Sequence, residues 1–198
     1  MERLENMNLP VRIMVLASLA ILMPIRWSQG AVVPRFSLEE LLRSSEMIVQ
    51  GRIARSWSAW DRGHKFIWTH YEVEVTETLK GPAIGRAIVS EPGGAVPGVR
   101  LGVDGSLTFV PGEEAVLCLY RTPIGYWRVY GNGQGKFSLV SNGRGEKRIH
   151  VNLPQARLLD AAGSSGTRVD AKSLNGGTLT DFKRLIRTRI VESPGKGT

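Results

Sequence analysis

The chain has 198 residues, a single cysteine and a formal net charge of +8. One cysteine excludes an internal disulfide, so the fold must depend on a hydrophobic core, which a chain of this length can bury. The length favours one domain, and the positive charge favours anionic partners, although the charges are scattered rather than gathered in one run. The cysteine, Cys118, lies in the apolar segment 115–120, which indicates a buried structural thiol rather than a nucleophile.

The first thirty residues have the order of a cleavable secretory signal peptide. Arg3 and Arg12 precede an uninterrupted apolar run over residues 13–23, and Ser28 and Gly30 supply small residues for cleavage. The run is shorter than the span of about 20 apolar residues that crosses a bilayer, and a buried N-terminal helix is the alternative interpretation. The segment carries three arginines and two glutamates, so the remainder carries +7. We expect that remainder to be secreted or periplasmic, without a transmembrane segment.

A short helix is predicted at the start of the remaining chain. Ser37 is a suitable N-cap, Glu40 completes a capping box, and Phe36 and Leu41 are placed to form a hydrophobic staple. Strands follow, predicted from β-branched and alternating apolar residues with Gly and Pro turns between them. They cover residues 47–55, 66–79, 87–90, 115–120, 126–130 and 136–140, with a last short one at 149–151. Gly51, inside the first strand, indicates a bulge or a bend.

Several short strands at regular spacing favour a barrel or a sandwich. We expect residues 31–155 to form a β-barrel domain and the Gly- and Ser-rich residues 156–177 to form a flexible loop or linker. Residues 178–198 are expected to form an amphipathic helix and tail. The apolar side chains of this helix predict packing on the domain, and a basic helix lying on an anionic membrane is the alternative.

Several segments resemble the pattern of a family of exported bacterial proteins of unknown function. Residues 44–53 are similar to that family's "SDxxVxGxV" strand, and residues 71–81 are similar to its "VxVxExLKG" strand. The next similarities are the "PGG" turn at 92–94, the "GExxLxFL" strand at 111–119 and the "GKF" at 135–137. The resemblance covers roughly residues 37–140. It implies an exported location and brings no activity with it.

The strand order is also similar, more distantly, to the netrin/TIMP-type OB barrel. This resemblance implies an all-β, OB-like barrel of about five or six strands, with a short N-terminal helix and a C-terminal helix. Proteins of that type bind partners, and some inhibit metalloproteases through an N-terminal cysteine. This chain has no such cysteine, so inhibition by that route is not implied.

Motifs for catalysis and for cofactors are not found in the sequence. The histidines are His64, His70 and His150, and no serine stands in a G-x-S-x-G elbow. His64 and His70, with Glu72 nearby, lack a third ligand that would define a zinc site. The Gly-rich segment 131–135 lacks the Lys-Ser/Thr pair of a phosphate loop. We therefore expect a non-enzymatic protein with no cofactor and no metal.

Aromatic side chains gather around one predicted hairpin. The candidate binding residues are Trp57, Trp60, Arg62, Phe66, Trp68 and His70. Exposed aromatic rings beside basic groups suit stacking against sugar rings, bases or a protein partner, and a second small core under the terminal helix or a loop is the alternative. We predict a binding module for a protein partner, such as a co-exported protease. The alternative is an anionic polysaccharide or, less favoured, nucleic acid.

Overall fold

The computed structural model describes residues 32–151, 157–159 and 171–192, which are mostly β. The predicted signal peptide and most of the predicted linker lie outside these residues. The helices are α2 (Leu38–Ser44), a 3₁₀ helix (Ala171–Leu174) and α3 (Leu179–Glu192). The strands are β1 (Val32–Pro34), β2 (Met47–Trp60), β3 (Ile67–Lys80), β4 (Arg86–Pro92), β5 (Gly94–Val96), β6 (Val99–Leu101), β7 (Glu114–Arg121), β8 (Trp127–Val129), β9 (Lys136–Ser141), β10 (Lys147–His150) and β11 (Arg157–Leu159).

Five of the described strands form a closed ring in the order β7, β2, β3, β4 and β8. β8 closes the ring because it pairs parallel with β4 and antiparallel with β7. β9 pairs with the first half of β7, along the same edge whose second half pairs with β8, and β10 pairs with β9. The prediction of an all-β, barrel-like fold with a helix before it and a helix after it is confirmed.

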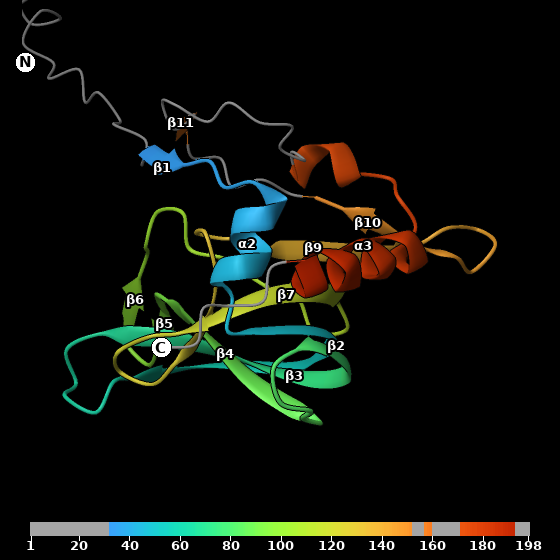
Figure 1. The fold of residues 1–198 in the computed structure, drawn as a ribbon. Helices are drawn as coiled ribbons and strands as arrows, with labels where there is room; N and C mark the ends of the chain where they lie inside the picture. The colour runs from blue at the N-terminus through green and yellow to red at the C-terminus, as the bar shows by residue number, and fades with distance from the viewer. Residues whose placement is uncertain (1–31, 152–156, 160–170, 193–198) are drawn as a thin grey trace, which may run out of the picture. The chain divides into compact units, whose positions relative to one another are not determined.

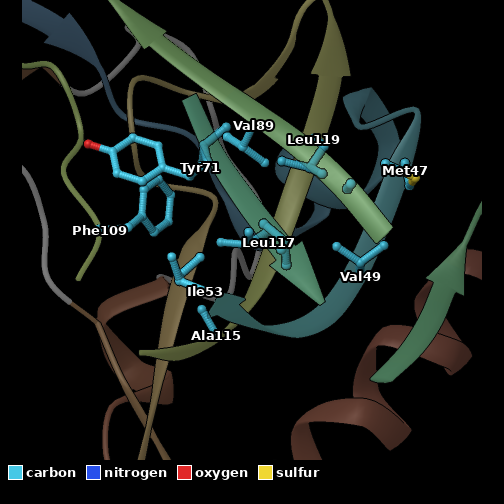
Figure 2. Close-up of a cluster of buried hydrophobic side chains, with 12 residues drawn as sticks. Met47, Val49, Ile53, Tyr71, Val89, Phe109, Ala115, Leu117 and Leu119 are labelled. Carbon is cyan, nitrogen blue, oxygen red and sulfur yellow. The ribbon is translucent and has the colours of Figure 1, made fainter. Parts of the chain in front are cut away.

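The interior of the barrel holds the first hydrophobic core. Its buried side chains alternate along the strands with residues that face outward, as the pleat of a β-strand requires. In β7, for example, Leu117 and Leu119 belong to this core, while Cys118 between them does not. Figure 2 shows the rings of Tyr71 and Phe109 side by side in this core, with their centroids 4.8 Å apart in an edge-to-face arrangement.

A second core lies between the helices and the outer face of β2, β7, β9 and β10. Helices α2 and α3 lie on the same face of these strands (Figure 1). Its buried members are Leu38, Leu41, Leu42, Ile48, Val116, Cys118, Phe137, Ile149, Phe182 and Ile186. The predicted packing of the terminal helix on the domain matches this arrangement. β7 is therefore buried on both faces, which explains its continuous apolar sequence.

Polar contacts fix α2 at both of its ends. The capping box predicted for α2 is present, because Ser37 Oγ accepts from the Glu40 N–H and the Glu40 carboxylate accepts from the Ser37 N–H. At the other end of α2, Lys80 Nζ donates to the carbonyl oxygens of Leu42 at 2.8 Å and Ser45 at 2.6 Å. These contacts satisfy carbonyl groups that a helix terminus leaves without an intrahelical partner.

Cys118 is expected to resist alkylation in the folded protein. Its side chain is fully buried, and burial raises the pKa of the thiol to about 12. Because the thiolate is the reactive form, a native sample at pH 8 should remain unmodified by iodoacetamide for hours, as measured by intact mass. A sample in concentrated urea should gain one label within minutes. Labelling of the native sample at the rate of an exposed thiol would contradict this burial.

Two differences from the sequence prediction concern short elements. β5 and β6 form a hairpin within the segment 93–101, where the sequence pattern predicts no strand. Inside the predicted linker, β11 pairs parallel with β1, and the 3₁₀ helix precedes α3. These elements have three or four residues each, which is too short for a periodic pattern of apolar residues to predict them.

Candidate functional site

A cleft of about 510 Å³ lies on the outer face of β3 and β4, beside the turn that joins β7 to β8. We call it the aromatic cleft, and its lining includes Trp57, His70, Arg86, Ile88, Tyr126 and Trp127. Its volume is in the range of sites that bury a small ligand or an anchor side chain, and such sites are commonly lined by apolar and aromatic groups with a few polar ones.

Strand pairing brings three of the side chains at the cleft into one row. Trp57 on β2 lies opposite His70 on β3, and His70 lies opposite Ser90 on β4. The rings of Trp57 and His70 have their centroids 5.4 Å apart, and His70 Nδ1 is 2.8 Å from Ser90 Oγ. Burial lowers the pKa of His70, so its imidazole is neutral at neutral pH. The cleft therefore presents a neutral, oriented ring rather than a cation at this position.

The turn between β7 and β8 supplies the aromatic rings on the opposite side. Tyr126 meets His70 edge-to-face with a centroid distance of 5.6 Å, and it meets Trp68 in the same way at 5.1 Å. The turn is held by its own backbone, because the Thr122 N–H donates to the Tyr126 carbonyl at 2.8 Å. Gly125 has φ of 88°, a conformation that favours glycine. The position of Tyr126 is thus set before any ligand binds.

Two arginines give the margin of the cleft a positive charge. Arg55 Nε lies 2.7 Å from one carboxylate oxygen of Glu72, and Arg86 Nε lies 3.1 Å from the other. The Glu72 side chain is 8% exposed, whereas the two arginine side chains are 69% and 67% exposed. The guanidinium of Arg55 also lies 4.9 Å from the centre of the Trp57 ring. Both arginines share the buried Glu72 carboxylate and remain accessible to a ligand, and Glu74 is the cross-strand neighbour of Arg86.

The structure separates the residues that the sequence groups as candidates. Trp57 and His70 line the aromatic cleft, and Trp57 is the more exposed of the aromatic candidates at 38%. Trp68 is half-buried beside Phe66, with a centroid distance of 5.5 Å. Nearer the end of the hairpin, Trp60 stacks on the His64 ring, and Arg62 is exposed in the turn. Trp68 and Phe66 thus support the cleft rather than line it.

The alternative interpretation is that the terminal helix or a loop buries these aromatic rings, and neither of the two accounts for all of them. α3 contacts the end of β3 away from the hairpin turn, where Lys183 and Arg187 form ion pairs with Glu77 and where Leu79 packs against the second core. The hydrogen bond from Lys183 lowers the pKa of Glu77 more than any other contact. The turn before β8 covers Trp68 through Tyr126 and leaves Trp57 exposed.

Sequence reasoning did not identify Arg86, Tyr126 and Trp127 as part of this site. Tyr126 and Trp127 are adjacent aromatic residues, which was a usable signal, but the pattern around them predicts only a strand. They lie at the same cleft as His70 because β8 closes the barrel against β4, and no local feature of the sequence predicts that pairing.

Other classes of site have less support in the residues that the structure describes. Within those residues, no helix is both long and apolar enough to cross a membrane. No three His, Cys, Asp or Glu side chains there form a group that could hold a metal ion. A comparison with protein-family models gives no match for this chain, and a comparison with curated protein sequences gives none either.

Proposed function

We propose that the protein is a non-enzymatic binding module that acts outside the cytoplasm and binds a protein partner through the aromatic cleft. The observation that carries this proposal is the concave site itself, in which an exposed tryptophan and two further aromatic rings surround a volume of about 510 Å³. Tryptophan, tyrosine and arginine are the residues that most often dominate the energy of protein interfaces, especially where they line pockets.

Two further arguments support the proposal. OB-type barrels bind their ligands on the face of their second and third strands, near the loops at its edges. In this chain that face is β3 and β4, and the adjoining turn precedes β8; this support is an analogy between folds. The signal-peptide pattern of the first thirty residues supports an exported location, as does the resemblance to a family of exported proteins.

Replacing Trp57 by alanine is expected to weaken binding of the partner by at least about tenfold, because truncation removes an anchor ring at the cleft. The protein expressed from the full chain is used to capture partners from the exported proteins of its source cell. Captured proteins are identified by mass spectrometry, and the affinity of the dominant one is measured by calorimetry.

Trp60→Ala is the matched control, because Trp60 lies on the same hairpin but does not line the cleft. We expect this variant to bind within about twofold of the wild type, in line with the small effects of most interface-peripheral residues. An equal loss of affinity in both variants would show that the whole hairpin, rather than the cleft alone, binds the partner. Capture of no specific protein that depends on Trp57 would contradict the proposal.

The second candidate is an anionic polysaccharide. The observation that favours it is the excess positive charge of Arg55 and Arg86 over Glu72. Binding of a polyanion falls steeply as the salt concentration rises, because bound counterions are released. A protein partner anchored by aromatic side chains should instead bind with little dependence on salt, so a salt titration of the affinity separates the two candidates.

A further inference from the structure

One half of β4 has a backbone edge that no strand of the barrel covers. Among the described residues, β4 and β8 are joined at a single pair, Val89 with Trp127. β8 runs parallel to β4 and begins at Trp127, so it extends from Val89 toward Pro92. The preceding residues of β4, Arg86–Ile88, therefore lie beyond the start of β8.

The N–H groups of Arg86 and Ile88 face this open side. In an antiparallel pair, alternate residues exchange hydrogen bonds with the partner strand, and the residues between them direct their N–H and C=O groups away from it. The Val75 N–H donates to the Gly85 carbonyl at 3.0 Å. By alternation Ala87 also bonds to β3, and the groups of Arg86 and Ile88 point away from β3.

The aromatic cleft reaches this edge. Ala87 belongs to the core inside the barrel, yet it also lines the cleft, so the cleft meets β4 along its backbone edge. Gly125, Tyr126 and Trp127 line the same cleft. An extended chain seated there would have backbone hydrogen-bonding groups on one side and aromatic rings near the other, which is the arrangement that binds peptides by strand addition.

The charges at the cleft indicate the chemistry of that chain. Arg55 and Arg86 both contact Glu72, and both guanidinium side chains remain largely exposed. A carboxylate from a bound chain would balance the second arginine and would gain a charge-assisted hydrogen bond. A basic chain would meet the like charges of the two exposed guanidinium groups at the same place.

We propose that the aromatic cleft receives an extended acidic peptide segment, which adds as a short strand to β4 at Arg86–Ile88 and places a carboxylate against Arg55 and Arg86. This inference rests on the proposed function, because it specifies how the protein partner is bound. Side-chain anchors near Trp57 and Tyr126 supply specificity, and the backbone pairing supplies an orientation that does not depend on sequence.

The test uses a library of random short peptides displayed on phage, selected against the protein expressed from the full chain. We expect selected peptides to be acidic and to have apolar residues at alternate positions. On binding, the amides of Arg86 and Ile88 should exchange with deuterium at least about tenfold more slowly. Ile88→Pro, which removes a donor that does not bond to β3, should weaken binding by about tenfold.

The outcomes separate this inference from the proposed function. If the peptides bind in a Trp57-dependent manner but Arg86 and Ile88 exchange at unchanged rates, the cleft stands as the site and strand addition is overturned. If no selected peptide requires Trp57, or if only a sulfated polysaccharide binds, both proposals fall. If Ile88→Pro does not fold, N-methylation of alternate peptide amides applies the same test to the wild-type protein, and equal binding of all methylated peptides overturns strand addition.

Discussion

Phe137→Ala is expected to lower the free energy of unfolding by about 3–5 kcal/mol, the range for removing a fully buried phenylalanine. Phe137 has no exposed surface and lies on β9 in the core beneath the helices. Its ring meets that of Phe182 on α3 with a centroid distance of 4.7 Å. The substitution therefore leaves a cavity at the contact between the sheet and the C-terminal helix, and urea unfolding followed by circular dichroism measures the loss.

Val140→Ala on the same strand is the matched control, because Val140 is 54% exposed. This variant should change the free energy of unfolding by less than about 0.5 kcal/mol. Hydrogen exchange in the folded Phe137→Ala variant should show faster exchange in α3 than in β2 and β3, since α3 loses a packing partner. A loss of less than about 1 kcal/mol would contradict the placement of Phe137 in the core.

Gly51→Ala is expected to cost about 3 kcal/mol, at the upper end of the usual range for overpacking. A Cβ atom at position 51 would lie 2.5 Å from the Glu74 carbonyl oxygen and 2.6 Å from Val73 Cγ1. The nearer contact is with the backbone of the paired strand, so a change of side-chain rotamer does not relieve it. The register of β2 and β3 shifts between Gln50 and Gly51, which confirms the predicted bulge.

Gly102→Ala is the control for this substitution. A Cβ atom there would meet no heavy atom within 4 Å, and the glycine does not have a left-handed backbone conformation. Its effect should stay within about 0.5 kcal/mol, as measured in the same urea titrations. If Gly51→Ala were equally harmless, the two strands would not approach each other as closely at the bulge as the structure places them.

The features that the sequence predicted correctly depend on residues close together in the chain. The capping box joins Ser37 to Glu40 within one helical turn, and the bulge at Gly51 follows from a glycine inside a strand pattern. The burial of Cys118 follows from the apolar run around it, and the apolar face of α3 follows from its helical period. Each of these depends on local geometry, which a single segment specifies by itself.

The candidate site depends in part on contacts between distant segments, which no single segment of the sequence specifies. The hairpin of β2 and β3 places Trp57 beside His70, because the two strands are consecutive and antiparallel. Tyr126 lies in the turn before β8 and Trp127 begins β8, and these two residues lie at the cleft with His70 only because β8 closes the ring between β7 and β4. That closure is a pairing between distant segments, whose register is set by the packing of the whole barrel. The sequence by itself determined the longer strands, the bulge, the capping box of α2 and one side of the cleft, whereas the tertiary structure alone decided the opposite side and the open edge of β4.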